Sequence, residues 1–237
     1  MDQQKQNYHR LKDLSAGLGF RLFGVADVTT LKAEFIFPPD VVKDLNYGIA
    51  LGFPLQEQVL AEIQEHPTLL YFNHYRQVNN FLDQSALKLA AFIQEQGNKV
   101  MPIPASQVID WQNQKGHVSH KKIAAAAGLG WIGRNNLLVT PRYGAQVRLV
   151  TILTDMPLST DTPLTDNCGA CRACIATCPA KAIKETPQDF DHQACFAQLK
   201  EFQRKKYVQQ CICGICVKAC KSGVKVPKES VNGSESK

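Results

Sequence analysis

Cys168-Gly169-Ala170-Cys171-Arg172-Ala173-Cys174-Ile175-Ala176-Thr177-Cys178-Pro179 is the stretch that decides the fold of this 237-residue chain. Its cysteines follow the spacing C-x2-C-x2-C-x3-C, which is typical of ligands of [4Fe–4S] clusters. The first three lie on one tight loop and can hold three corners of one cube. The fourth lies one helical turn further on and faces away, so we expect it to serve a second cluster.

A second set of cysteines supplies the partners that this arrangement needs. Cys195 stands alone, and Cys213, Cys216 and Cys220 follow it with the spacing C-x2-C-x3-C. Two such sets predict two clusters with exchanged ligands. We assign one cluster to Cys168, Cys171, Cys174 and Cys220, and the other to Cys195, Cys213, Cys216 and Cys178.

Other uses of these cysteines explain the pattern less well. Zinc sites usually combine two C-x2-C pairs or mix cysteine with histidine, and a third cysteine at the same short step has no place in one tetrahedron. Disulfides need an oxidising compartment. The polar start of the chain, residues 1–6, shows no apolar signal-peptide core, so we expect a cytoplasmic protein. Cys211 has the wrong spacing to Cys216 for a ligand, which favours a buried free thiol.

Length and composition allow a second folded unit before the cysteines. The chain is 44% hydrophobic and 20% charged, as in a soluble globular protein. No apolar run is long enough to cross a bilayer, so no membrane association is expected. The net charge of +6 is modest, and part of it can offset the negative clusters rather than attract nucleic acid. We predict a domain over 1–158, a ferredoxin-type module with two [4Fe–4S] clusters over 159–222, and a disordered tail over 223–237.

The first of these regions reads as alternating helices and strands, which indicates an α/β fold. Leucines at helical spacing predict a first helix that ends near Gly17. A second helix runs through Leu82–Ile93 and stops at Gly97. A third, Ala-rich helix is expected over 121–127, followed by a glycine turn over 128–133. The expected strands are 20–26, 47–53, 100–103, 137–140 and 147–154, and residues 155–167 read as a linker.

One segment of this region has an unusual charge distribution. Residues 111–154 contain no Asp or Glu. The segment does contain the cations and histidines Lys115, His117, His120, Lys121, Lys122, Arg134, Arg142 and Arg148. Its glycines would let a ligand approach the backbone N–H groups, which suits an anion. We interpret the segment as a pocket for phosphate or carboxylate groups; the alternative is a buried sheet with a basic rim.

The sequence resembles the epoxyqueuosine reductase family and, more distantly, the corrinoid-dependent reductive dehalogenases. The resemblance rests on the motif Ala127-Gly128-Leu129-Gly130-Trp131-Ile132-Gly133-Arg134-Asn135, followed by the double cysteine set beginning Cys168-Gly169-Ala170-Cys171. It also includes Leu137-Leu138, Gly144, Thr154-Asp155, Leu158, Leu18-Gly19-Phe20 and Gly24-Val25-Ala26. It covers roughly residues 10–222.

This resemblance implies a cobalamin bound between the α/β domain and the ferredoxin-like module. The clusters would pass electrons to cobalt, which performs the chemistry. Carried over to this chain, the corrinoid-binding residues would be Gly128, Gly130, Trp131, Gly133 and Arg134. The implied partners are an electron donor such as a ferredoxin or flavodoxin, and a small-molecule or modified-nucleoside substrate.

The chain departs from the family at three places. The tRNA-modifying members carry an Asp, as proton donor, some thirteen residues before the glycine motif, whereas this chain has Gln114-Lys115-Gly116-His117 there. Asp110 is nearby but offset. Lys221, rather than Pro, follows Cys220, and the family's helical-repeat region, which helps to grip tRNA, does not follow. These departures argue against tRNA as the substrate.

Three hypotheses follow. The first is a corrinoid-linked iron–sulfur reductase of an unidentified substrate, with His117, His120 or Asp110 as candidate catalytic residues. The second is a non-catalytic, ferredoxin-like electron-transfer protein that docks a partner through its N-terminal domain. The third is epoxyqueuosine reduction with the tRNA held by the basic stretch alone, which would make binding steeply salt-dependent.

Overall fold

A computed structural model describes residues 2–221. The predicted tail, 223–237, lies outside the described residues. The helices are α1 (Gln3–Gly17), α2 (Pro39–Val42), α3 (Glu57–Glu62), α4 (Leu69–Glu95), α5 (His120–Ala126), α6 (Ala173–Thr177), α7 (His192–Arg204) and α8 (Ile215–Ala219), with a 3-10 helix η1 (Thr29–Glu34). The strands are β1 (Leu22–Asp27), β2 (Tyr47–Pro54), β3 (Val100–Ile103), β4 (Trp131–Ile132), β5 (Leu138–Val139) and β6 (Val147–Thr154).

Four strands form the central sheet in the order β1-β2-β6-β3, and each neighbouring pair is antiparallel. The register places Leu51 opposite Val150 and Ile49 opposite Ile152. Helices and sheet are combined as the α/β prediction expects. The pairing is antiparallel, however, whereas alternating helices and strands usually indicate a parallel sheet. β4 and β5 form a separate antiparallel pair.

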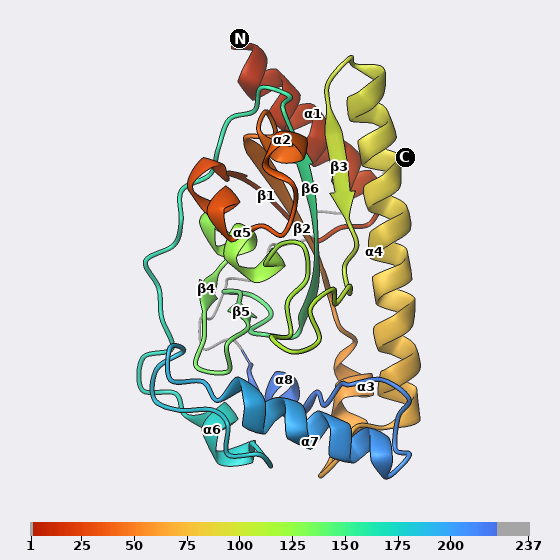
Figure 1. Cartoon of the computed structure of the whole chain (residues 1–237), viewed down its shortest axis with the longest axis vertical. Coiled ribbons are helices and arrows are strands. Elements are labelled where there is room, and N and C mark those ends of the chain that lie inside the picture. Colours follow the sequence, from red (N-terminus) through yellow and green to blue (C-terminus); the bar gives the residue numbers. More distant parts are fainter. Residues whose placement is uncertain (1, 222–237) are drawn as a thin grey trace, which may run out of the picture.

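Helices cover both faces of the sheet, with α4 along one side and α5 on the other (Figure 1). Side chains alternate between the faces along a strand. Ile49 and Leu51 of β2 therefore pack in the core that includes α1 and α4. Ala50 packs in the second core with Ile123 of α5. The sheet is thus buried on both faces.

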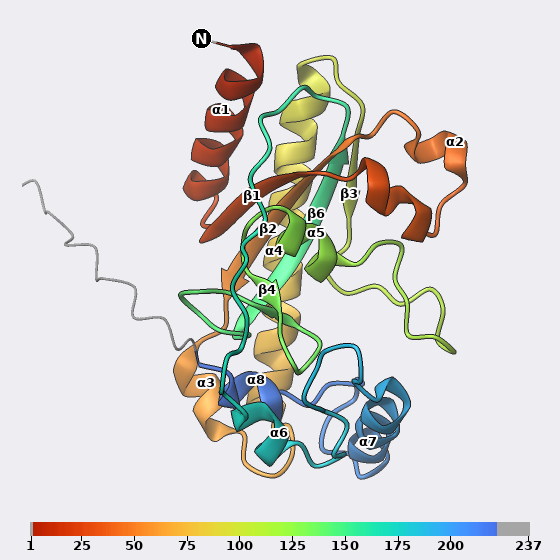
Figure 2. The same cartoon turned by 90° about the vertical axis from the view of Figure 1, so that its left-hand side faces the viewer.

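The cysteine-rich segment folds below the sheet, where α6, α7 and α8 gather beside α3 (Figures 1 and 2). Phe202 and Ile215 of this segment belong to the same hydrophobic core as Leu60 and Tyr71. Lys218 of α8 also donates through Nζ to the carbonyl oxygens of Ala61 and Ile63 at the end of α3. The two regions therefore share one core. The proposed boundary between residues 158 and 159 stays a prediction.

Several elements differ from the sequence prediction in length or kind. The helix expected through Leu82–Ile93 is the C-terminal half of α4, which begins at Leu69 because the Thr68 hydroxyl caps it by accepting from the Tyr71 backbone N–H. Residues 131–132 pair as β4, although they were expected in a turn. The elements η1, α2 and α3 were not predicted. The strand expected over 147–154 is confirmed as β6.

The predicted linker is pinned to the edge of the sheet. The carboxylate of Asp161 accepts from the backbone N–H of Val25 at 2.8 Å and from the Tyr8 hydroxyl at 2.9 Å. Burial raises the pKa of Tyr8 to about 12, and the Asp161 carboxylate adds to this increase. The linker is thus held to β1 and α1 at Asp161. Among the described residues, no helix has the length and apolar character needed to span a membrane.

Candidate functional site

The first cysteine loop has a backbone shaped for close spacing of its thiols. Gly169 adopts a φ of +48°, which is a left-handed conformation that glycine tolerates best. Its N–H donates to the Asn167 side chain at 2.7 Å, and the Cys171 N–H donates to the Cys168 carbonyl at 3.0 Å. The loop then enters α6, which carries Cys174. The local turn therefore holds three thiols on one side.

Arg134 fixes this loop from the side of the glycine motif. Its guanidinium donates to the carbonyl oxygens of Gly169 and Cys171, each at 2.9 Å, and to that of Glu185 at 2.8 Å. The side chain is 14% exposed, so these bonds are largely shielded from water. Arg134 therefore holds the cysteine loop against the glycine motif.

The cysteines separate into two groups in space. Burial raises the pKa of Cys220 to about 11, and the thiols of Cys174, Cys168 and Cys171 contribute further. Such interactions act only between nearby groups. Cys220 therefore lies with the first three cysteines although it is distant in sequence.

The second group is formed by Cys178, Cys195, Cys213 and Cys216. Burial raises the pKa of Cys213 to about 11, with further contributions from Cys195 and Cys178. Burial also raises the pKa of Cys216 well above its usual value, and the neighbouring thiols add to the increase. The Cys174 thiol also acts on Cys216, so the two groups adjoin. Their division into two exchanged ligand sets stays a prediction. Ligation of iron by these groups stays a prediction.

Cys211 lies apart from both groups. Burial raises the pKa of its thiol, and the charge that acts on it is that of Lys200. Its Sγ donates to the Gln203 side chain. In the part of the chain that the structure describes, no three His, Cys, Asp or Glu side chains are arranged to hold a single metal ion. A [4Fe–4S] cluster distributes its iron over four corners, so its thiolate ligands need not converge on one point.

A small cavity of about 220 Å³ lies against the second group. We call it the cysteine cavity; it is lined by Lys121, Asn135, Asn136, Leu137, Cys178, Pro179, Ala180, Ile183, Phe190, His192, Cys195, Gln198, Leu199, Cys213 and Cys216. All four cysteines of the group therefore line one space.

A larger cavity of about 910 Å³ opens between the sheet and the cysteine segment. The lining of this large cavity includes Glu34 of η1, Ile36, Tyr71 of α4, residues 114–116 and 118–122, Leu137, Arg148 of β6 and His192 of α7. Lys121, Leu137 and His192 also line the cysteine cavity. A shared wall of three side chains therefore separates the large cavity from the second cysteine group.

Two cations in the wall of the large cavity have no carboxylate partner within residues 2–221. Arg148 donates to the Asn79 amide at 2.9 Å and to the Tyr75 hydroxyl at 3.1 Å, and its guanidinium lies 4.3 Å from the centre of the Tyr75 ring. Lys121 donates through Nζ to the backbone and side-chain oxygens of Asn136 at 2.6 and 2.7 Å. Burial lowers the pKa of Lys121 to about 8. The cavity is therefore suited to an anionic or polar ligand.

His120 is held as a neutral ring. Its Nε2 lies 2.9 Å from the Pro104 carbonyl oxygen, which can only accept, so Nε2 carries the proton. Its Nδ1 accepts from the hydroxyl of Thr151 at 2.8 Å. Burial lowers the pKa of His120 to about 4. Both ring nitrogens are occupied, which disfavours the predicted role of His120 as a proton donor.

The other two predicted catalytic residues do not line the large cavity. His117 stacks on the Phe37 ring at 4.5 Å, and its Nδ1 bonds to the Gln107 side chain. Asp110 is turned to its own loop, where Asn113 donates to its carboxylate and lowers its pKa. Gln114, which stands where the family resemblance expects an Asp, does line the cavity.

Comparisons with known proteins identify similar sequences and similar folds. No protein-family model matches the chain. An epoxyqueuosine reductase from Listeria monocytogenes is 37% identical over 95 residues, which are 39% of this chain and 25% of that protein. A solved catabolic reductive dehalogenase in complex with 3-bromo-4-hydroxybenzoic acid has a TM-score of 0.70 at 19% identity, over 92% of this chain and 32% of that one. A solved epoxyqueuosine reductase with an epoxyqueuosine-modified tRNA stem loop has a TM-score of 0.64 at 19% identity, over 91% of this chain and 64% of that one.

The chain is similar to epoxyqueuosine reductases and to reductive dehalogenases. The resemblance seen in the sequence motifs is thus confirmed, and the solved structures show the same fold. The match to the Listeria protein spans only a quarter of that protein's length.

The epoxyqueuosine reductase-like motif lies in the structure where its glycines permit close backbone packing. A Cβ on Gly130 would lie 2.1 Å from the Val139 carbonyl oxygen, and one on Gly128 would lie 2.6 Å from that of Thr162. A Cβ on Gly133 would meet the Val139 side chain at 2.5 Å. None of the five residues predicted to bind the corrinoid, which include Trp131 and Arg134, lines the large cavity. Their surroundings give them packing roles, and corrinoid contact by them stays a prediction.

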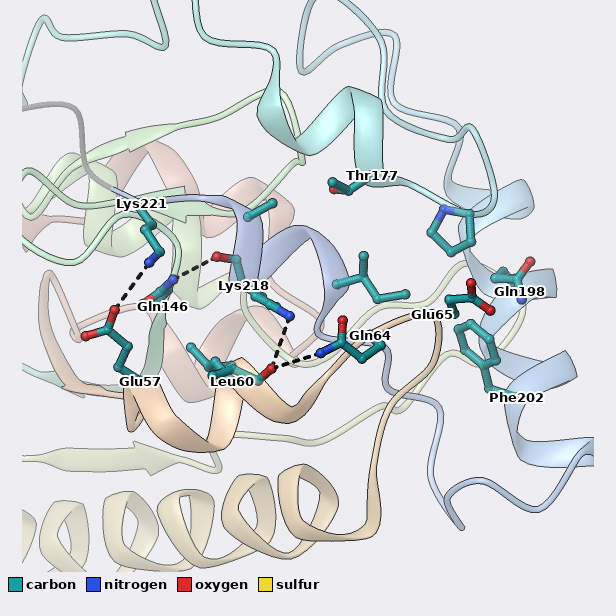
Figure 3. A pocket seen from close by; sticks show the side chains of 14 residues that line it. Glu57, Leu60, Gln64, Glu65, Gln146, Thr177, Gln198, Phe202, Lys218 and Lys221 are labelled. Carbon is teal, nitrogen blue, oxygen red and sulfur yellow. Dashed lines mark hydrogen bonds and ion pairs between the residues drawn. The ribbon is translucent and has the colours of Figure 1, made fainter.

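A separate groove of about 830 Å³ lies between α3 and the cysteine segment (Figure 3). Lys221 pairs with Glu57 at one end, and Gln146 donates to the Lys218 carbonyl nearby. Thr177 and Pro179 flank Cys178 in its wall. The groove therefore borders the helices that carry the exchanged cysteines, but it shares no lining residue with the large cavity.

Sequence reasoning missed several residues of the large cavity. Tyr71, Ile36 and His192 come from three distant segments, and no local pattern marks them. Thr68 did offer a signal, because a threonine before an apolar run is a helix start. Recognising it would have extended α4 to Tyr71.

Proposed function

We propose that this chain is an iron–sulfur oxidoreductase in which two [4Fe–4S] clusters feed electrons to a corrinoid in the large cavity, where a substrate is reduced. The observation that carries the proposal is the shared wall. Lys121, Leu137 and His192 border both the cysteine cavity and the large cavity. An electron leaving the second cluster would therefore have a short path into the ligand space.

The thiols fit the proposed clusters. Each group contributes four sulfur ligands, the number that a [4Fe–4S] cluster takes. Burial raises the pKa of the Cys195 and Cys213 thiols to about 11, and neighbouring thiols add to the increase. Thiolates this close together are unfavourable without cations to compensate them, and iron would supply that charge. The clustering of these cysteines is thus better explained by a metal than by packing.

The large cavity has the size and charge of a cofactor site. Its volume of about 910 Å³ is near the upper end of the usual range for cofactor sites, roughly 300–1,000 Å³. Arg148 and Lys121 would bind the amide and phosphate groups of the ligand. Leu137, Leu149 and Val147 would exclude water from its face. When bound, the corrinoid supplies a metal that takes up electrons and transfers them to the substrate.

Lys121 is the proton donor that the geometry favours. Its ammonium lies in the shared wall, and its pKa of about 8 is near the operating pH of a cytoplasmic enzyme. His192 lies close to it, because the charge of Lys121 contributes to the lowered pKa of that ring. We therefore assign proton donation to Lys121 and His192 rather than to His120, because both ring nitrogens of His120 are already hydrogen-bonded. His117 and Asp110 lie outside the cavity lining and would act only after a loop movement.

The substrate class stays open between a small molecule and a modified nucleoside. The solved relative with a tRNA stem loop shows that a protein of this fold can bind tRNA. In this chain the cavity wall has Gln114 where the family has an acid, and a Gln cannot donate a proton of suitable acidity. We therefore do not favour epoxyqueuosine-containing tRNA.

The decisive experiment is anaerobic reconstitution followed by corrinoid titration. We expect about eight iron and eight sulfide per chain, since each cluster contributes four of each. Cobalamin should then change its cobalt absorption bands on binding at micromolar concentration, and Arg148→Met should weaken the binding. Arg142→Met is the matched control, because Arg142 is exposed and does not line the cavity.

The outcome separates the proposal from its alternatives. Full iron loading without corrinoid binding would instead support the non-catalytic electron-transfer protein. Rapid turnover of epoxyqueuosine-containing tRNA by the wild type would restore that substrate. If Gln114→Asp is needed for such turnover, the missing acid is the reason for the difference.

A further inference from the structure

Asn135 has a buried group that the proposed function does not use. Its side chain is 3% exposed, and the amide nitrogen Nδ2 is buried without a hydrogen-bond partner. Within residues 2–221, Trp131 Nε1 is the other buried side-chain atom in this condition. A buried donor without an acceptor is costly, so its position indicates an acceptor other than residues 2–221.

The other atom of the amide fixes its orientation. Oδ1 accepts from the Leu137 backbone N–H at 3.3 Å, and only the oxygen of the amide can do so. Oδ1 also lies on the side of Gly133, where an added Cβ would be 3.1 Å from it and 3.4 Å from Sγ of Cys168. Nδ2 is therefore the atom left without a backbone contact.

Asn135 lines the cysteine cavity together with all four thiols of the second group. Its neighbour Asn136 lines the same cavity, but the side-chain oxygen of Asn136 accepts from Lys121. Of these two amides, only that of Asn135 has a nitrogen that is buried and without a partner among residues 2–221. Asn135, whose side-chain nitrogen has no partner, thus borders the space in which the second cluster would lie.

We propose that Nδ2 of Asn135 donates a hydrogen bond to a sulfur atom of the cluster held by Cys178, Cys195, Cys213 and Cys216, and so raises its reduction potential. The proposal rests on the cluster assignment of the proposed function. Reduction adds an electron and hence negative charge to the cluster. An N–H donor stabilises the more negative form more strongly, so it favours reduction. Asn135 is thus a positioning and tuning residue rather than a ligand.

The test uses the reconstituted full chain with the side-chain amides of its asparagines labelled with 15N. Partial reduction should give a paramagnetic second cluster with a 15N hyperfine coupling in pulsed EPR. Asn135→Leu should remove this coupling. It should also lower the equilibrium constant for reduction about tenfold, which for one electron is a shift of about 59 mV to more negative potential.

Asn136→Gly is the matched control. Asn136 has a φ of +58°, which glycine adopts readily, and the backbone oxygen that accepts from Lys121 is retained. The Asn136→Gly variant should keep the 15N coupling, and its equilibrium constant for reduction of the second cluster should stay within about twofold of the wild type. Cys171→Ser changes a ligand of the first group only and so identifies which redox wave belongs to that cluster.

The outcomes distinguish this inference from the proposed function. Absence of iron and of any cluster signal in the wild type would remove the proposed function itself. Intact clusters without an asparagine coupling would overturn the role of Asn135 alone, as would a shift confined to the first cluster. If Asn135→Leu does not fold, the labelled wild type still decides, because the coupling is either present or missing there.

Discussion

Replacing Arg134 should loosen the first cysteine loop and leave the second group intact. Arg134→Gln removes two charge-assisted hydrogen bonds to that loop, at the carbonyl oxygens of Gly169 and Cys171. A hydrogen bond from a charged group contributes about 1.5–3 kcal/mol when shielded from water. Taking the lower value for each bond, the loop loses about 3 kcal/mol, which is roughly a hundredfold in its opening equilibrium.

Iron release to a chelator measures this opening. In the reconstituted protein, Arg134→Gln should release about four of the irons up to a hundredfold faster than the wild type, while the other four leave at the wild-type rate. Arg134→Lys should be intermediate, because one ammonium cannot reach three carbonyls in the planar geometry of a guanidinium.

Arg172→Gln is the control for a change of charge beside the same loop. Arg172 pairs with Glu185, but both side chains are 59% exposed, so the pair contributes little. Its iron release should stay within about twofold of the wild type. Equal acceleration from both cysteine groups in Arg134→Gln, or no acceleration at all, would refute the idea that Arg134 holds the first loop.

Three further predictions concern other parts of the molecule. Cys195→Ser should lower the iron content of the reconstituted protein, whereas Cys211→Ser should not, because Cys211 lies apart from both groups; iron loss in the latter would reopen the ligand assignment. Burial lowers the pKa of Lys121 to about 8, which is below its value in the unfolded chain. Between about pH 8 and 10 the unfolded state therefore binds more protons than the folded state, so the stability that depends on this residue rises with pH over that range. When Lys121→Gln is denatured at several pH values, this rise in the free energy of unfolding should be absent. A pH profile unchanged from that of the wild type would contradict the assigned pKa. Asp161→Ala should destabilise the fold by about 1–3 kcal/mol, because the Val25 N–H loses its acceptor. Asp166→Ala, in the exposed part of the same linker, should be neutral in the same denaturation experiment, and equal effects would show that the linker is not pinned at Asp161.

Local spacing was sufficient for elements such as β6, whose bounds match the prediction. The grouping of Cys178 with the second set also rests on local spacing, namely one helical turn, and stays a prediction. Local signals were insufficient where segments meet only through folding, as Tyr71 and His192 do at the large cavity. Gly130 illustrates the difference. A glycine indicates that something approaches its backbone, and here it is the Val139 carbonyl rather than a ligand.

The exchange of cysteines has a consequence for the order in which the clusters form. With the proposed assignment, every ligand of the second cluster lies between Cys174 and Cys220, so the second cluster is nested inside the chain loop that the first one closes. Closing that loop directly spans about 45 residues, but only about 6, namely 175–177 and 217–219, remain unanchored once the inner cluster exists, which lowers the entropic cost by roughly 2 kcal/mol. The second cluster should therefore assemble before the first, and the first cluster then joins two chain segments that the second cluster has already brought together.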